Sequence, residues 1–123
     1  MRHYLIAAAV LGFLAVLFGA FGAHALKQWL SVAELASWKT AVQYQMFHGL
    51  CIIGLVVLYR QQAQSYLSQS AGLMLAGTLL FSGSLYLLLL LKWRWLGPVT
   101  PLGGVLLLTG WLRLLVGVVK DKA

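Results

Sequence analysis

The sequence has 123 residues, of which 62% are hydrophobic and only 9% are charged. Soluble domains carry about 25% charged residues, so this composition excludes an ordinary soluble domain. The formal net charge is +7, and the basic residues stand singly or in pairs at the ends of apolar runs. That placement is typical of contacts with lipid headgroups and not of a nucleic-acid surface, so we expect membrane lipid, and no nucleic acid, as a partner.

Four apolar segments follow one another along the chain. Each approaches or exceeds the roughly 20 residues that a helix needs to cross a bilayer core. The sequence therefore predicts an all-α integral membrane fold, with four transmembrane helices in a compact antiparallel bundle and a single transmembrane domain over residues 1–123. The predicted spans are residues 4–26, 41–59, 71–91 and 102–119.

Small residues recur along the first span and continue into the sequence GAFGAHAL at residues 19–26. In lipid such residues let two helices approach closely, so we expect this stripe to pack against another helix. Arg2 and Ala23-His24-Ala25 also imitate a secretory signal with its cleavage site. The uncharged run exceeds the roughly 7 to 15 residues of a signal core and another span follows it, so we expect this helix to be retained. The stripe comprises Ala8, Gly12, Ala15, Gly19 and Gly22.

A helix-start signature precedes the second span. Ser31 at the N-cap position and Glu34 three residues later form a capping box, which predicts a helix beginning at Val32. No helix breaker follows before Gly49, so we expect the helix to run unbroken to Tyr59. Its length of about 42 Å exceeds the bilayer core. We therefore predict an interfacial helical extension before the second span, at a depth that suits Trp29 and Trp38.

The last two connectors differ in character. RQQAQSYLSQS, residues 60–70, is polar and predicts a turn, whereas KWRWLGPVTP, residues 92–101, predicts an anchor at headgroup level. Thr100 and Pro101 fit the N-cap and the first position of the last helix. Stripes of small residues on the last two spans would serve packing inside the bundle or contacts in an oligomer. They comprise Gly72, Ala76 and Gly83 on the third span and Gly103, Gly110 and Gly117 on the fourth.

The charges at the two membrane surfaces bear on orientation. With four spans the two termini share one side. The basic residues divide equally between the sides: Arg2, Arg60, Lys120 and Lys122 with the termini, and Lys27, Lys39, Lys92 and Arg94 opposite. Arg113 can extend toward the C-terminal end, and this tips the positive-inside balance toward cytoplasmic termini.

Few polar side chains lie inside the predicted spans. Tyr44, Gln45 and His48 share one face of the second helix, and His24 ends the first span, so both histidines are expected near the same membrane surface. Together these residues form a candidate ligand site, in which neutral imidazoles would bind haem or a metal. Interhelical hydrogen bonds are the simpler interpretation, and we favour it. We therefore assign no cofactor, metal or catalytic residue, and keep haem or quinone as the alternative.

Arg113 is the one charge well inside a predicted span, and such a residue is by default functional or paired. The acidic residues of the chain are Glu34, on the opposite side, and Asp121, two turns further along the same helix. A carboxylate partner inside the membrane is therefore largely excluded. We expect the Arg113 side chain to extend toward lipid headgroups, with backbone carbonyls, a lipid phosphate or a partner protein as alternatives.

Enzyme chemistry finds little support. No Asp or Glu lies inside the predicted spans to act as general acid or base. A serine nucleophile at Ser82 or Ser84 with His48 as base is conceivable. Close helix packing, with both hydroxyls bonded to backbone, explains FSGSLY more simply. The sequence therefore predicts that the protein is not an enzyme.

Four motifs occur in order along the chain. They are GAFGAHAL (19–26), TAVQYQMFHGL (40–50), FSGSLY (81–86) and GPVTPLGG (97–104), followed by Gly110-Trp111. These motifs resemble the YgdD/YwdK-like family of small bacterial inner-membrane proteins, which has mitochondrial relatives in animals. The resemblance implies a multi-pass protein of the bacterial inner (plasma) membrane, without established function or catalytic residues. Positions inside the motifs to test first are His24, Gln45, His48, Ser82, Thr100 and Pro101, and the fourth motif closes on Gly103 and Gly104.

Three functional hypotheses follow from the sequence. The first is a non-enzymatic protein that acts by helix-mediated association, as a homo-oligomer or as an accessory subunit of a larger membrane complex. It is favoured because the chain has several stripes of small residues and almost no reactive side chains. The first alternative is a binder or carrier of a lipophilic ligand, such as a quinone, lipid or haem, that uses the two histidines. The second alternative is a small transporter or channel.

Overall fold

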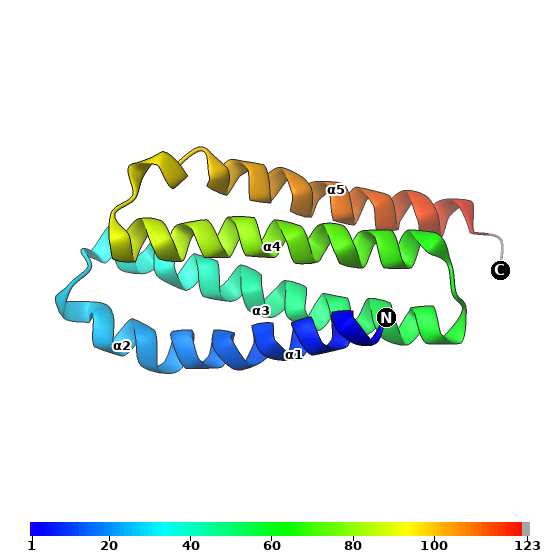
Figure 1. The fold of residues 1–123 in the computed structure, drawn as a ribbon, viewed down its shortest axis with the longest axis horizontal. Coiled ribbons are helices and arrows are strands. Elements are labelled where there is room, and N and C mark those ends of the chain that lie inside the picture. The colour runs from blue at the N-terminus through cyan, green and yellow to red at the C-terminus, as the bar shows by residue number, and fades with distance from the viewer. Residues whose placement is uncertain (122–123) are drawn as a thin grey trace.

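The computed structural model describes residues 1–121, so Lys122, which enters the predicted charge balance, lies outside the described residues. Four long helical stretches lie side by side in an elongated bundle (Figure 1). The first stretch consists of α1 (Arg2–Leu17), the π-helical turn η1 (Phe18–Gly22), α2 (Ala23–Ala25) and the 3-10 turn η2 (Leu26–Gln28). The others are α3 (Val32–Gln61), α4 (Ser65–Leu91) and α5 (Val99–Lys120), with the 3-10 turn η3 (Arg94–Leu96) before α5.

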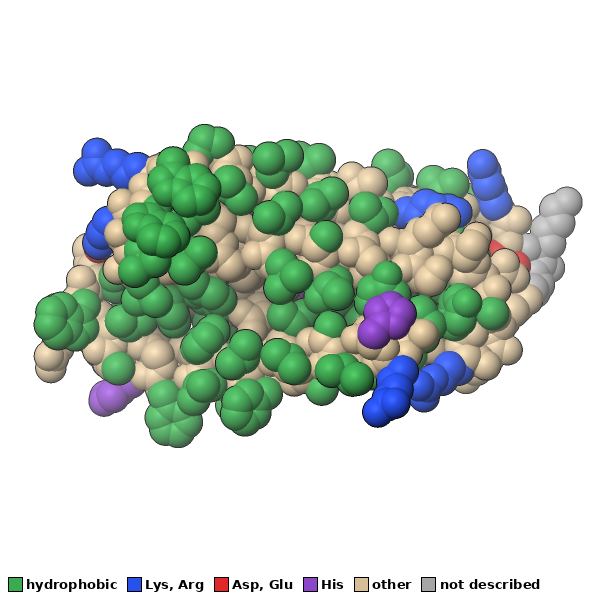
Figure 2. Space-filling view, viewed as in Figure 1, with side chains coloured by type: hydrophobic (Ala, Val, Ile, Leu, Met, Phe, Trp, Pro, Cys, Tyr) green, Lys and Arg blue, Asp and Glu red, His purple; other side chains and the backbone are tan. Residues whose placement is uncertain are grey.

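The all-α membrane fold is confirmed. Within residues 1–121 there is no strand, and four helical stretches are long and apolar enough to cross a membrane. α3 packs against α1 and α4, and α4 packs in turn against α5, so α3 and α4 form the centre of the bundle. In Figure 2 hydrophobic side chains cover the middle of the visible face, and most Lys and Arg side chains lie toward its two ends. This distribution matches an apolar belt between two headgroup regions.

The predicted start of α3 is confirmed. The Ser31 hydroxyl accepts a hydrogen bond from the Glu34 N–H at 3.1 Å, and the Glu34 carboxylate accepts one from the Ser31 N–H at 3.0 Å. The helix then runs unbroken for 30 residues to Gln61. The Glu34 carboxylate also forms an ion pair with Lys92, the residue that ends α4 in a left-handed conformation. The first turn of α3 is thereby joined to the end of α4.

Two predicted helix starts differ from the structure. The polar connector shrinks to three residues, 62–64, because α4 begins at Ser65. α5 begins at Val99, so the prediction that Thr100 is its N-cap is wrong. Pro98 takes the N-cap position with helical dihedral angles, and Pro101 is tolerated in the first turn because N–H groups there have no helical acceptor. The Thr100 hydroxyl pairs instead with the Ser84 hydroxyl of α4.

The glycines of α5 bring this helix into backbone contact with α4. A Cβ atom at Gly103 would overlap the backbone nitrogen of Phe81 and lie 2.9 Å from the carbonyl oxygen of Gly77. A Cβ atom at Gly110 would lie 2.9 Å from the Met74 side chain, and one at Gly117 would overlap the Tyr66 ring. The predicted stripe therefore packs inside the chain, against α4. α5 can lie this close to α4 only because these three residues have no side chains.

The stripe of the first helix packs against α3. Ala8 and Ala15 are buried, and a Cβ atom at Gly19 would lie 3.1 Å from the Val42 side chain. Gly22 similarly faces Trp38, whose ring would lie 3.0 Å from an added Cβ atom. Gly12 differs from the other members, since nothing lies within 4 Å of the equivalent position. The partner helix, which the sequence did not identify, is α3.

The π-helical turn η1 forms the docking site of Trp38. The Trp38 indole N–H donates a hydrogen bond to the Phe18 carbonyl oxygen at 3.0 Å, and the same oxygen accepts the N–H of Ala23, five residues on. The Trp38 ring also packs against Phe18 and Tyr86, with ring centroids 5.8 and 4.7 Å away. Trp38 is thus buried in the bundle rather than placed at its surface, whereas Trp29 is exposed as an interfacial residue would be.

Candidate functional site

A buried glutamine connects three helices near the middle of the bundle. Gln45, on α3, donates a hydrogen bond through Nε2 to the Leu11 carbonyl oxygen of α1 at 2.7 Å. Its Oε1 accepts a hydrogen bond from the Tyr86 hydroxyl of α4 at 2.6 Å. Gln45 is only 3% exposed, so this amide has exchanged membrane or water contacts for protein partners. The arrangement fixes the relative depth of α1, α3 and α4.

His48 lies one turn further along α3 and joins this helix to α5. The indole N–H of Trp111 donates to His48 Nε2 at 3.0 Å. Since an indole can only donate, Nε2 is the acceptor and the ring proton resides on Nδ1. Nδ1 then donates to the Tyr44 carbonyl oxygen, 2.8 Å away. His48 is therefore held as a neutral imidazole with both ring nitrogens engaged, in the interhelical bonding that we favoured from the sequence.

The structure does not bring His24 and His48 together. His24 is exposed in α2, and the neighbouring Gly22 lies level with Trp38. His48 is ten residues beyond Trp38, or about 15 Å along the axis of α3. The two histidines therefore share no candidate ligand site, because the continuous helix α3 carries His48 about three turns beyond the level of Trp38. Among the described residues, no group of three His, Cys, Asp or Glu side chains could hold a metal ion.

A groove opens beside His48 on the surface between α3 and α5, with α4 at its base. Its volume is about 470 Å³, within the range of small-molecule sites. The aromatic rings of Tyr44, Phe81 and Trp111 line it together with the His48 imidazole. The remaining lining residues are aliphatic, proline or glycine: Pro101, Gly104, Val105, Leu107 and Leu108. Tyr44, Gln45 and His48 thus remain close to one another, but Gln45 does not line this groove.

The aromatic rings of the groove contact one another at its inner end. Tyr44 and Phe81 have ring centroids 4.6 Å apart, and Trp111 meets the His48 ring edge-on at 6.0 Å. Leu108 is 70% exposed and Trp111 is 47% exposed, so the groove opens outward where an apolar surface meets lipid. His48 lies about 24 Å from the start of α3 and about 20 Å from its end, which places the groove beside the middle of this helix.

The serines of the third span serve helix packing. The Ser82 hydroxyl donates to the Ala41 carbonyl oxygen of α3 at 2.7 Å, and the Ser84 hydroxyl contacts the Phe81 carbonyl oxygen and the Thr100 hydroxyl. Ala41 is seven residues, about 10 Å, before His48 on α3, so Ser82 and His48 form no nucleophile–base pair. Gly83 between the two serines has open space around it.

Arg113 has a partner that the sequence did not identify. Its Nε donates a hydrogen bond to Gln69 Oε1 on α4 at 2.7 Å. Its guanidinium also lies 5.9 Å from the centroid of the Tyr66 ring. A second groove of about 470 Å³ contains this pair and shares no lining residue with the groove beside His48. The chain therefore presents two separate candidate sites.

Sequence reasoning missed the role of several aromatic residues. Trp111 was noted only as the end of a motif, although a tryptophan far from both ends of an apolar span carries an N–H group that needs an acceptor. Phe81 and Pro101 reach the groove because α5 approaches α4 so closely at Gly103. No periodicity indicates this contact, because it depends on which pair of helices meets.

Coupling between Gln45 and Tyr86 provides a test of the central hydrogen bonds. We expect Gln45→Leu to lower the free energy of unfolding by about 2 kcal/mol and Tyr86→Phe by about 1 kcal/mol, since each removes a buried hydrogen bond. The double variant should lose less than the sum, by about 0.5 to 1 kcal/mol, because the two changes remove one shared bond. Equilibrium unfolding in mixed detergent micelles measures all four proteins. Strict additivity would show that the bond contributes nothing.

Comparisons with known proteins identify a family of membrane proteins. Residues 18–104 match a family described as "Protein of unknown function (DUF423)". Over 121 residues the chain is 43% identical to the "UPF0382 inner membrane protein YgdD" of Escherichia coli, covering 98% of this chain and 92% of that protein. It is 39% identical over 120 residues to UPF0382 membrane proteins of Staphylococcus saprophyticus, with 98% and 99% covered, and of Staphylococcus epidermidis, with 98% of each covered. No solved structure matches.

Proposed function

The chain belongs to the DUF423 family and is a multi-pass inner-membrane protein, and we propose that it binds a lipophilic ligand with a flat ring in the groove between α3, α4 and α5. The carrying observation is the wall of rings from Tyr44, Phe81 and Trp111 around a buried His48. Quinones are the ligand class that this chemistry fits best. The function is non-enzymatic in this proposal, and the names of the relatives state no enzymatic activity.

The composition of the groove favours a ring over a plain acyl chain. Aromatic side chains attract flat π-systems by offset stacking and edge-to-face contact, worth about 0.5 to 1.5 kcal/mol per pair beyond area burial. A saturated acyl chain gains no stacking energy from these rings, so aliphatic side chains would bind it equally well. The location also suits a membrane-dissolved ligand, because the groove opens sideways into lipid and a ligand enters without crossing the headgroup region.

The polar groups at the groove give a ring with carbonyl oxygens a place to bond. The Tyr44 hydroxyl makes no hydrogen bond to another described residue, and Tyr44 is 40% exposed at the rim. The Trp111 indole N–H, which also lines the groove, donates to His48 Nε2 at 3.0 Å. His48 in this proposal positions the indole and is not itself a metal or haem ligand, since both its nitrogens are engaged.

The association hypothesis loses its main motivation and stays a prediction. It was based on stripes of small residues, yet Gly19, Gly22, Gly103, Gly110 and Gly117 all face neighbouring helices of the same chain. These contacts explain most of the stripes on the first and last spans without a second subunit, whereas Gly12 and Gly83 have nothing within 4 Å of an added Cβ atom and Ala76 is exposed. No contact, groove or charge in residues 1–121 specifically favours a transporter or channel over a binder. The groove beside His48 therefore carries the proposal.

Filling the groove tests this function. A Cβ atom at Gly104 would lie 3.9 Å from the Phe81 ring, an ordinary contact, so Gly104→Phe adds a ring to the groove without backbone overlap. Gly54→Phe is the matched control, because Gly54 is exposed on α3 with nothing within 4 Å. We expect a short-chain menaquinone to quench tryptophan fluorescence saturably in wild-type protein in nanodiscs. Gly104→Phe should weaken this binding about tenfold or more, and Gly54→Phe should leave it unchanged.

Partitioning of quinone into the bilayer without binding to the groove would give a different result. Quinone that merely partitions into the bilayer quenches all five tryptophans without saturation. If quenching is unsaturable, and equal in wild type, Gly104→Phe and Gly54→Phe, the groove does not bind this ligand class. Trp111→Phe identifies the reporting residue, because it should remove the saturable component only if the ligand lies beside position 111.

A further inference from the structure

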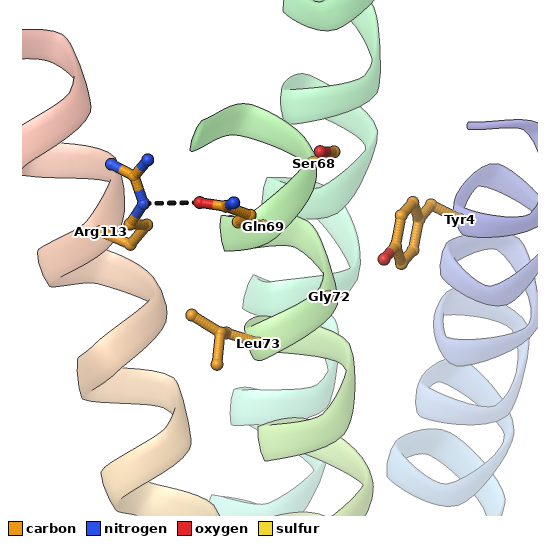
Figure 3. Close-up of a pocket in the computed structure, with 6 residues that line it drawn as sticks. All are labelled: Tyr4, Ser68, Gln69, Gly72, Leu73 and Arg113. Carbon is orange, nitrogen blue, oxygen red and sulfur yellow. Dashed lines mark hydrogen bonds between the residues drawn. The ribbon is translucent and has the colours of Figure 1, made fainter. Parts of the chain in front are cut away.

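The second groove lies on the opposite side of α5 from the first and contains Arg113, the cation well inside the fourth predicted span. It runs over the outward face of α4, with α1 on one side and α5 on the other (Figure 3). Tyr4, Gly72, Leu73 and the pair of Arg113 and Gln69 line it, together with Ser68. We propose that this groove binds the phosphate group of an anionic phospholipid, with Arg113 as the principal ligand.

The hydrogen bonding of Arg113 is incomplete in a way that suits an oxyanion. A guanidinium has five N–H donors, and only the Nε donor has a protein acceptor among the described residues, namely Gln69 Oε1. The four donors on the two terminal nitrogens have none. Figure 3 shows these nitrogens above the hydrogen bond to Gln69, toward the level of Ser68 and away from Leu73. Two parallel donors of this kind form the fork that binds phosphate bidentately.

Gln69 holds the guanidinium without neutralising it. A carboxylate at position 69 would form an ion pair and compete with an incoming anion, whereas an amide oxygen accepts the Nε hydrogen and leaves the full positive charge. The guanidinium carbon also lies 5.9 Å from the centroid of the Tyr66 ring, which is uncharged. Arg113 is therefore oriented by uncharged neighbours, and its charge is available to a ligand.

The depth of the groove matches a lipid phosphate. Arg113 lies seven residues before the end of α5 at Lys120, about 10 Å along the helix, and its terminal nitrogens extend back toward that end. A long cationic side chain at this depth reaches the boundary between hydrocarbon and headgroups. An acyl chain attached to the phosphate would then lie over Gly72 and, one turn further, over the exposed Ala76. Ala76 is small and leaves room along α4, and over Gly72 the acyl chain would pack beside the Tyr4 hydroxyl, whose oxygen lies 2.8 Å from the position of an added Cβ atom.

The charge at this end of the bundle also favours an anion. Arg2, Arg60 and Lys120 are exposed at the same end as Arg113. The one acidic side chain at this end among residues 1–121 is Asp121, which accepts a hydrogen bond from the Tyr66 hydroxyl at 3.0 Å. Glu34, the other acidic residue of the chain, forms its ion pair with Lys92 at the far end. Anionic lipid therefore meets an excess of positive charge here, with the deepest cation in the groove.

Native mass spectrometry of the full chain in mild detergent tests the proposal. Phosphatidylglycerol and phosphatidylcholine with identical acyl chains are added separately, and the fraction of protein carrying each lipid is measured. We expect wild type to prefer phosphatidylglycerol, and Arg113→Gln to lower its affinity about tenfold or more, because a charged bidentate contact is lost. Arg113→Lys should retain part of the affinity. The matched control Arg94→Gln, at the other end, should change little.

Two further arms make the result decisive. Inorganic phosphate at millimolar concentration should not displace phosphatidylglycerol from wild type; displacement would assign the site to free phosphate instead of lipid. Gly72→Leu fills the groove while keeping every charge. Its Cβ atom would meet only the hydroxyl end of Tyr4, with the oxygen 2.8 Å away, so a shift of that side chain lets the variant fold and we expect it to lose the lipid. If both Arg113→Gln and Gly72→Leu bind phosphatidylglycerol as wild type does, the proposal is overturned. If Arg113→Gln does not fold, the binding of phosphatidylglycerol by Gly72→Leu decides whether the proposal holds.

Discussion

Gly103→Ala is expected to lower the free energy of unfolding by about 3 kcal/mol, the upper range for an overpacked core. The added methyl group would overlap the backbone nitrogen of Phe81 and lie 2.7 Å from its Cα atom. Backbone atoms cannot rotate away as a side chain can, so α5 would have to move off α4. The intrinsic preference of alanine over glycine in a helix, about 1 kcal/mol, opposes this loss only in part.

The neighbouring glycine supplies the control. Gly104→Ala places its methyl group 3.9 Å from the Phe81 ring, where it makes an ordinary contact. Its stability should equal or slightly exceed that of wild type, since helix propensity improves and nothing overlaps. Reversible unfolding in mixed micelles, followed by circular dichroism, compares the two variants. Equal stability of Gly103→Ala and Gly104→Ala would mean that α4 and α5 are not in backbone contact at this point.

Trp38→Ala is expected to cost about 3 to 5 kcal/mol, the range for removing a buried aromatic side chain. Trp38 is only 3% exposed, and its ring fills the space between Gly22, Phe18 and Tyr86. Truncation leaves a cavity and removes the N–H donor to the Phe18 carbonyl oxygen. The same unfolding measurement reports the loss.

Trp38→Phe separates packing from hydrogen bonding. It keeps most of the ring contacts and loses only the indole N–H, so we expect a loss of about 1 kcal/mol. Trp29→Ala is the matched control, because Trp29 is exposed near the same end of the bundle. If Trp38→Ala costs no more than Trp29→Ala, Trp38 is not a core residue and the docking of η1 on α3 is incorrect.

The sequence predicted the helices well because their signals are local. Apolar length determines a span, and the Ser31 and Glu34 pair marks the first residue of α3 within one turn. The start of α5 was missed by two residues, since Thr100 and Pro101 imitate an N-cap and a first helical residue, whereas the structure has Pro98 and Val99 at these positions. The residues near a helix start are often compatible with several first residues, and the tertiary contacts determine at which of them the helix begins.

The partners of each helix could not be predicted, because they depend on helix order and rotation. Gly103, Gly110 and Gly117 were identified as a packing stripe, yet nothing in their spacing names α4 as the neighbour. The spans are apolar on all sides, so no polar face shows which side turns inward. The π-helical turn η1 is a further example: it accommodates Trp38 from another helix and has no signature in its own five residues.

In the candidate site, too, the features with a local sequence signal were predicted and those that depend on helix packing were not. Tyr44, Gln45 and His48 were grouped correctly on one face by helical spacing. The pairing of His48 with His24 failed because the depth of His48 depends on how far α3 extends beyond α1. Trp111, which completes the groove, lies 63 residues from His48 in the sequence and was outside the reach of any local pattern.

The most direct test of the ligand-binding account is to identify what the protein carries when it is purified gently from its native membrane. Organic extraction followed by mass spectrometry should find one ring-containing lipophilic compound, near one molecule per chain in wild type and Gly54→Phe, and strongly depleted in Gly104→Phe. Finding no such compound in wild type, or the same amount in folded Gly104→Phe, would contradict the account.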